Sequence, residues 1–241
     1  MPNRQNKPQQ LALPIQLRAS SVFASYCTGE NQHALSLLQD LHRSGPSPVV
    51  FIYGVSGVGK THLLQAACVS MTGQGKHSGY FPLRELHAYG PELLQGTERM
   101  DLVCIDDVGL VLNQKDWCLG LFNLYRQLEE RGGKLLLADE CSPAMLKMAL
   151  PDLASRILAG TALRLKPLDE PEQIEALQMH ASLRGLILTE EIVSYILRRL
   201  PRDMHSLCAF IDQLDLASLA SQRKLTIPFV KQVLAQTGYD L

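Results

Sequence analysis

The sequence predicts an α/β protein in which a parallel β-sheet is followed by a small all-helical domain. Between about residues 21 and 166, short apolar segments alternate with helical patterns, an order that builds a parallel sheet with helices on both faces. Residues 167–241 carry helical patterns alone. A glycine-rich loop also lies directly between an apolar strand and a helix, which is typical of α/β phosphate-binding proteins.

The first part of the sheet region is expected to alternate helix and strand. A helix over residues 31–42 begins at Asn31, a common capping residue, and repeats leucine at helical spacing. Residues 48–53 read PVVFIY and predict a buried strand. The next helix starts near Lys60, and the aromatic segment 79–83 predicts a short strand.

The second part of the sheet region continues this alternation. Residues 102–105 form an apolar run that predicts a buried strand, and residues 115–131 have the period of an amphipathic helix. The run of leucine and alanine at 135–138 predicts a further buried strand. A last short strand at 162–165 closes the sheet before Pro167.

Four helices are expected after the sheet. Thr189 and Thr226 each precede a helical pattern and are good helix-capping residues. The chain therefore divides into a tail at 1–20, an α/β domain at 21–166 and a helical domain at 167–241. The four helices are expected over residues 171–183, 190–200, 203–221 and 227–236.

The glycine-rich loop has the phosphate-binding pattern G-x-x-x-x-G-K-[ST]. Its glycines let backbone N–H groups point inward at an anion, and the following helix adds its positive end. Lys60 can reach the β- and γ-phosphates, and the Thr61 hydroxyl can ligate Mg²⁺. The sequence therefore predicts binding of a nucleoside phosphate. The expected binding residues are Gly54, Val55, Ser56, Gly57, Val58, Gly59, Lys60 and Thr61.

Acidic residues follow two of the predicted strands. Asp106 ends the strand at 102–105, which is where such folds place the carboxylate that holds Mg²⁺ together with Thr61. Asp107 stands where a water-activating carboxylate would lie, or it caps the following turn. Asp139, after the next strand, is a candidate for contact with the γ-phosphate or the attacking water.

Two arginines lie after the last of these strands. Arg156 falls between the strand at 135–138 and the helical domain, and Arg202 opens the third helix of that domain. The position of Arg202 would let it face the phosphate-binding loop if the helical domain folds over the sheet. From composition alone, an ordinary surface arginine is the better explanation of each, and the family resemblance described below changes that balance.

Composition limits the class of protein. None of the 241 residues belongs to an apolar run long enough to span a membrane, and the N-terminus lacks the apolar core of a signal peptide, so we expect a cytoplasmic protein. The cysteines form no C-x-x-C pair, and we expect them to act as small apolar residues. A net charge of -1 indicates little direct DNA binding.

The tail contains an apolar segment within a polar stretch. Residues 1–20 are basic and rich in Gln, Asn and Pro, so most of the tail is expected to be disordered. Residues 10–17 read QLALPIQL and cannot be buried locally. This segment is either a strand that packs on the α/β domain or a short linear motif that binds a groove on a partner.

Several segments together carry a resemblance to a known family. They are residues 22–26 with Gly29 and Asn31, and residues 54–61, 103–107, 137–139, 150–156 and 224–231. These segments resemble those of AAA+ ATPases of the bacterial DnaA family. The resemblance covers nearly the whole chain and implies a AAA+ domain at 21–166, a helical lid domain at 167–241, and ADP or ATP with Mg²⁺ as ligands. It implies that Asp139 is sensor 1, Arg156 the arginine finger and Arg202 sensor 2.

The resemblance is strongest to a short homologue of the DnaA initiator that inactivates it. The tail is similar to the motif with which such a homologue binds the DNA polymerase III sliding clamp, although Ala12 and Ile15 replace the more usual Ser and Leu. The chain also stops after the lid, where the initiator has a DNA-binding domain. The expected clamp-binding residues are Gln10, Leu11, Leu13, Pro14 and Ile15.

This resemblance implies a regulator of replication. With the DNA-loaded clamp, the chain would stimulate hydrolysis of ATP bound to the DnaA initiator, by supplying Arg156 in trans, and so inhibit re-initiation. Homo-oligomers are also possible. Asp106-Asp107 replaces the usual Asp-Glu pair, so the chain's own hydrolysis is expected to be weak. The alternatives are a DNA-remodelling or helicase-loader-type ATPase, a small-molecule P-loop kinase and a clamp-loader subunit.

Overall fold

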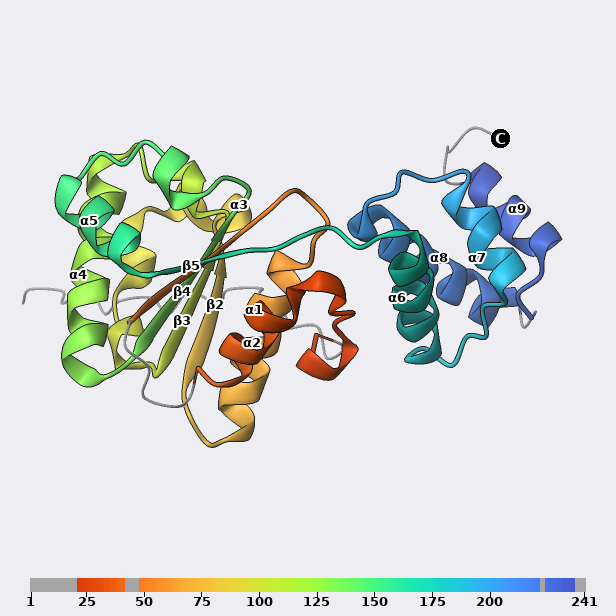
Figure 1. The fold of residues 1–241 in the computed structure, drawn as a ribbon, viewed down its shortest axis with the longest axis horizontal. Coiled ribbons are helices and arrows are strands. Elements are labelled where there is room, and N and C mark those ends of the chain that lie inside the picture. The colour runs from red at the N-terminus through yellow and green to blue at the C-terminus, as the bar shows by residue number, and fades with distance from the viewer. Residues whose placement is uncertain (1–20, 42–47, 222–223, 237–241) are drawn as a thin grey trace, which may run out of the picture.

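The computed structural model describes residues 21–41, 48–221 and 224–236. Figure 1 shows a sheet with helices on both faces, joined by a single extended segment to a separate group of helices. The five-stranded sheet has the order β2-β3-β4-β1-β5, and every strand pair is parallel. The predicted fold class is therefore confirmed. The strands are β1 (Val49–Tyr53), β2 (Ser78–Pro82), β3 (Leu102–Asp106), β4 (Lys134–Asp139) and β5 (Thr161–Arg164).

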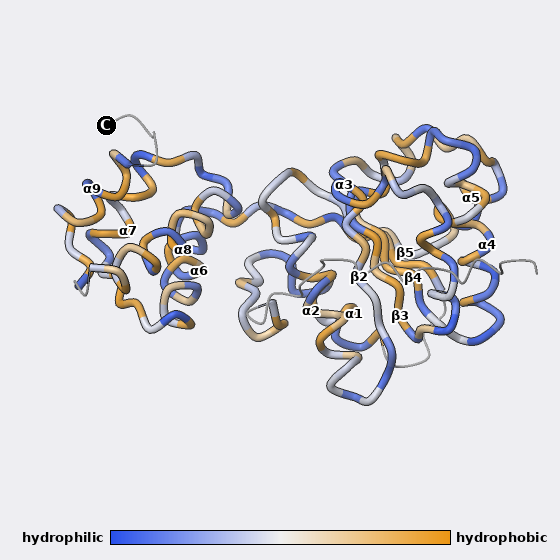
Figure 2. Tube along the Cα trace, turned by 180° about the vertical axis from the view of Figure 1, so that it is seen from behind, coloured by the Kyte–Doolittle hydropathy of each residue, from blue (hydrophilic) through white to orange (hydrophobic). Residues whose placement is uncertain are grey.

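Alternation along β1 explains why the sheet is covered on both faces. Val49 and Phe51 belong to one buried cluster, whereas Val50 and Ile52 belong to another, because successive strand side chains point to opposite faces. Figure 2 shows the tube in the orange of hydrophobic residues along β3 and β4. A strand buried on both sides must be apolar throughout.

Different helices cover the two faces of the sheet. α1 (Gln32–Gln39) and α2 (Lys60–Gly73) pack on one face, and α4 (Lys115–Arg131) and α5 (Pro151–Ala159) pack on the other. The short α3 (Leu83–Leu86) follows β2 directly. Trp117, Leu121 and Leu128 of α4 are buried, as their helical spacing predicts.

The four helices after the sheet form their own core. Thr189 accepts a hydrogen bond from the backbone N–H of Ile192, and Thr226 accepts one from that of Phe229, so both predicted helix starts are confirmed. The core includes Leu177, Val193, Phe210, Ile211 and Val230, all of them almost fully buried. The helices are α6 (Glu170–Ser182), α7 (Glu190–Leu197), α8 (Met204–Ser221) and α9 (Ile227–Gln236).

Asn31 has a different contact from the one its position predicts. It stands at the start of α1 but makes no capping hydrogen bond with its side chain. Its amide nitrogen instead donates to the carbonyl of Lys166, and its amide oxygen accepts from the N–H of Lys166, at 2.9 and 2.7 Å. Asn31 therefore ties the turn before α1 to the segment between β5 and the lid helices.

The tail and its proposed clamp-binding residues 10–15 lie outside the described residues, as does the predicted end of the first helix at residue 42. Within the described part of the chain, no helix combines the length and the apolar character needed to cross a membrane.

Candidate nucleotide site

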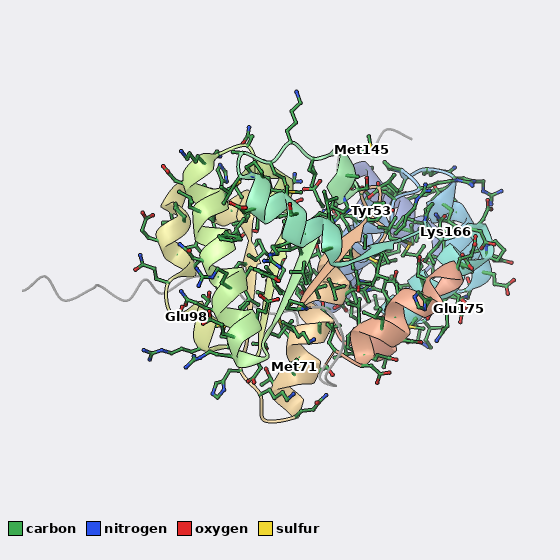
Figure 3. All side chains as sticks on the ribbon, turned by 60° about the vertical axis from the view of Figure 1, so that its left-hand side comes forward. Tyr53, Met71, Glu98, Met145, Lys166 and Glu175 are labelled. Atoms are coloured by element: carbon green, nitrogen blue, oxygen red, sulfur yellow. The ribbon has the colours of Figure 1, made fainter. Side chains whose placement is uncertain are left out.

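The phosphate-binding loop connects β1 to α2. Figure 3 labels Tyr53 at the end of β1, from which the loop departs, and Lys166 on the segment that leads from β5 to the lid helices. A Cβ atom on Gly54 would lie 2.6 Å from the carbonyl oxygen of Leu165, so this position requires glycine. The loop is thus held against the neighbouring strand end.

Lys60 closes the loop from inside. Its ammonium group donates to the carbonyls of Gly54 and Val55 at 2.7 and 3.0 Å, and its side chain is buried. A buried ammonium needs such partners because the loss of hydration is costly. The three N–H groups of this ammonium could equally donate to phosphate oxygens. The motif predicts this role for Lys60.

Thr61 and Asp106 meet as the sequence predicts. The Thr61 hydroxyl donates to Asp106 Oδ2 at 2.6 Å, and the carboxylate also accepts from the Tyr80 hydroxyl and from the N–H of Asp107. Asp106 is buried and, among the described residues, forms no ion pair with a cationic side chain. Burial raises the pKa of Asp106, because it removes water from the ionised carboxylate. A cation bound beside the carboxylate would stabilise the ionised form.

This donor set fits Mg²⁺. A hydroxyl and a carboxylate are hard oxygen ligands, and Mg²⁺ is usually held by one or two carboxylates with water and phosphate oxygens. Because Thr61 and Asp106 are already in contact, little rearrangement would be needed to hold the ion.

Asp107 is held by an arginine that no motif indicated. Its backbone is in the left-handed region, with φ of 53°, and its carboxylate accepts from Arg84 Nε at 2.9 Å and from Arg84 Nη2 at 3.3 Å. The expected alternative, a side-chain cap on the following turn, is not formed. Arg84 lies in the first turn of α3, far from Asp107 in sequence, so only the folded chain reveals the pair.

Both carboxylate oxygens of Asp139 accept hydrogen bonds from backbone N–H groups. Oδ2 accepts from the N–H of Gly109 at 2.7 Å, and Oδ1 accepts from the N–H of Cys141 at 3.0 Å. Asp139 therefore joins the segment after β3 to the segment after β4. A role at the γ-phosphate stays a prediction.

The start of α8 lies against the phosphate-binding loop. A Cβ atom on Gly57 would lie 3.1 Å from the Cβ of Asp203, so the lid helices approach the loop at its glycine. Arg202, just before α8, donates to Glu170 Oε2 at 2.7 Å. Arg202 therefore directly precedes Asp203, the residue that approaches the loop, but its guanidinium is paired with Glu170 of the lid domain.

Arg156 lies within α5, between β4 and the helical domain as predicted, on the face of the sheet opposite to α2. Its guanidinium is exposed and lies 5.8 Å from the centre of the Tyr125 ring. Within the described part of the chain, its side chain contacts Tyr125 and not the phosphate-binding loop. Arg156 is therefore separate from the chain's own site and faces solvent.

The segment before α1 packs beside the loop. The Tyr26 hydroxyl donates to the carbonyl of Val58 at 3.2 Å, and its ring lies 5.8 Å from that of His62. Burial raises the pKa of Tyr26 to about 12, so the hydroxyl remains a donor at neutral pH. The sequence indicated this segment only by resemblance and assigned Tyr26 no role.

The contact between Tyr26 and Gly59 leads to a prediction. Gly59 has φ of +90°, and an added Cβ would lie 2.6 Å from Tyr26 Cε2. Gly59→Ala should destabilise the protein by about 1–2 kcal/mol through backbone strain alone, with a further loss from the clash. Thermal unfolding measures the change.

Gly75→Ala is the matched control, because Gly75 has φ of +73° but no atom near an added Cβ. The Gly59 variant should melt lower than the Gly75 variant. Equal melting temperatures would mean that the close approach to Tyr26 has no energetic weight.

Comparison with known proteins agrees with this architecture. Residues 169–234 match the lid-domain family of Hda. The fold is similar to domain III of the replication initiation protein DnaA from Thermotoga maritima, with a TM-score of 0.79 and 20% identity over 92% of this chain and 98% of that chain.

Two further solved structures extend the comparison. AMPPCP-bound DnaA from Aquifex aeolicus gives a TM-score of 0.68 and 21% identity, covering 85% of this chain and 68% of that one. The RuvB Holliday junction branch migration motor of Thermotoga maritima gives a TM-score of 0.63 and 17% identity over 88% and 69%. These identities show the fold, which is that of AAA+ proteins.

Proposed function

We propose that this chain, a DnaA-related AAA+ protein with a lid domain of the Hda family, is a nucleotide-binding regulator that promotes hydrolysis of ATP on the DnaA initiator. The match of residues 169–234 to the Hda lid is the observation that carries the proposal. Hda is the short DnaA homologue that inactivates the initiator. The same fold occurs in a branch migration motor, so the fold alone leaves the activity open, and the lid match is what favours a regulator of the initiator.

The chain's own site would hold ADP or ATP with Mg²⁺. Backbone N–H groups of residues 54–61 and the ammonium of Lys60 would bind the phosphates, while Thr61 and Asp106 would hold the ion. Bound Mg²⁺ would neutralise phosphate charge. Because α8 begins against Gly57, nucleotide in the loop would also stabilise one position of the lid domain, with Arg202 as a further phosphate contact.

Weak hydrolysis in this site is consistent with the contacts of its acids. Asp107 is shorter than the usual Glu and is engaged by Arg84, and both oxygens of Asp139 accept backbone hydrogen bonds. A carboxylate engaged in this way is poorly placed to activate water. The nucleotide of this chain would therefore act mainly as a conformational ligand.

We place the stimulated ATP hydrolysis in the nucleotide site of the initiator. Arg156 is exposed and does not contact the chain's own loop, so its guanidinium is free to enter the nucleotide site of a neighbouring initiator. The planar fork of arginine can bind two phosphate oxygens at once. There it would stabilise the charge that spreads over the γ-phosphate oxygens as the bond between the γ-phosphorus and the ADP leaving group breaks.

The tail would bring the two proteins together. Residues 10–15 would bind the sliding clamp on DNA, which raises the effective concentration of this chain near the initiator. Replacing Leu11 and Leu13 by Ala should abolish retention on immobilised clamp and leave the melting temperature nearly unchanged. A large fall in melting temperature would instead favour a tail strand that packs on the α/β domain.

A reconstituted assay tests the proposal. ATP bound to DnaA should be hydrolysed faster when this chain, ADP and DNA-loaded clamp are all present, and omission of the clamp should remove most of the stimulation. The matched control is the tail variant with Leu11 and Leu13 replaced. If DNA alone stimulates ATP hydrolysis by this chain and initiator-bound ATP is unaffected, the DNA-remodelling alternative is correct.

A further inference from the structure

The Tyr80 hydroxyl makes a contact that the proposed site does not yet explain. It donates to Asp106 Oδ2 at 3.0 Å, the same oxygen that accepts from Thr61. Tyr80 lies on β2, and neither its position nor its type belongs to the phosphate-binding motif. Both residues are buried, with Tyr80 9% and Asp106 4% exposed.

The sheet explains why these side chains meet. Tyr80 pairs with Cys104 across β2 and β3, and Leu102, Cys104 and Asp106 alternate onto one face of β3. That face carries α2, because Leu102, Cys104 and Tyr80 all belong to the buried cluster that includes Leu63 and Leu64. The ring of Tyr80 is therefore held in the core, with its hydroxyl at the end of the sheet beside Thr61.

Three hydrogen bonds orient the Asp106 carboxylate. One of the three donors is itself a candidate ligand of the ion, and the other two are not. Thr61 is itself a candidate ion ligand, so its hydroxyl would take part in coordination. The Tyr80 hydroxyl and the N–H of Asp107, at 3.0 and 3.1 Å, have no such role. A phenol also keeps its proton at neutral pH, so Tyr80 remains a donor to the carboxylate.

We propose that Tyr80 is a positioning residue for the magnesium ion, holding the Asp106 carboxylate in the orientation from which it binds the ion beside Thr61. The inference rests on the proposed nucleotide site. Residues that orient a metal ligand by a hydrogen bond typically change metal affinity by about 10- to 100-fold when they are removed.

The test is Tyr80→Phe, which removes the hydroxyl and keeps the ring in the core. The affinity for ADP is measured by calorimetry in EDTA and at a series of Mg²⁺ concentrations. We expect the affinity in EDTA to be unchanged, and the Mg²⁺ concentration for half-maximal enhancement to rise by about tenfold. Tyr125→Phe is the matched control, since the Tyr125 hydroxyl also donates to a carboxylate, that of Glu129, on the opposite face of the sheet.

A second background separates positioning from packing. The Asp106→Asn variant lacks the carboxylate that would bind the ion. Adding Tyr80→Phe to this variant should therefore produce no further change in the Mg²⁺ dependence of ADP affinity. An unaltered Mg²⁺ dependence in Tyr80→Phe alone would overturn the inference, as would an equal loss of ADP affinity with and without Mg²⁺. If the unmodified protein binds no ADP, the proposed nucleotide site fails, and the role of Tyr80 fails with it.

Discussion

Arg156→Ala should abolish the ability of this chain to accelerate ATP hydrolysis on the initiator. An arginine supplied in trans to phosphoryl transfer contributes about 10³- to 10⁵-fold in rate in comparable systems, so the stimulated rate should fall to near the unstimulated one. Single-turnover hydrolysis of ATP bound to DnaA, with clamp and DNA present, measures the effect. Lys at this position should rescue little, because a point charge cannot reproduce the planar fork.

The same variant should keep its fold, its nucleotide and its clamp binding. Arg156 is exposed, and its contact with the Tyr125 ring is worth about 0.5–1 kcal/mol at such a site. Arg126→Ala on the neighbouring α4 is the matched control, since it also removes an exposed arginine. Full stimulation by Arg156→Ala would refute the role in trans, and weaker binding of the chain's own nucleotide would place the residue in cis.

Lys60→Ala should abolish stabilisation of the protein by nucleotide. A ligand at 100 times its Kd stabilises the folded state by about 2.7 kcal/mol, which corresponds to a rise in melting temperature of roughly 5 to 11 °C for a chain of this size. Lys60 is the one side-chain cation that the loop motif aims at the phosphates, so the variant should show almost no rise. Thermal unfolding with and without ADP and Mg²⁺ measures it.

The comparison must be made within each variant. Removing Lys60 also removes two hydrogen bonds to the carbonyls of Gly54 and Val55, so the melting temperature without nucleotide is expected to change as well. Lys147→Ala, an exposed lysine outside the site, is the control and should keep the full rise. An undiminished rise in Lys60→Ala would refute the assigned phosphate site.

The elements of the fold could be predicted because their signals are local. Residues 135–138 are apolar throughout since β4 is buried on both faces, and the helix predicted over 115–131 has the same bounds as α4. The order of the strands could not be predicted. β1 lies between β4 and β5, and connections through helices leave no pairing signal between strands that are distant in sequence.

The candidate site also has a part that could be predicted from the sequence and a part that could not. The sequence alone determined the loop, because the glycines, Lys60 and Thr61 act through contiguous backbone geometry, and it placed Asp106 at the end of an apolar strand. Only the tertiary structure decided which side chains engage these groups. Tyr80 reaches Asp106 and Arg84 reaches Asp107, because parallel pairing of β2 with β3 brings their carboxyl ends to one edge of the sheet. Such contacts join residues far apart in the chain, and no spacing in the sequence records them.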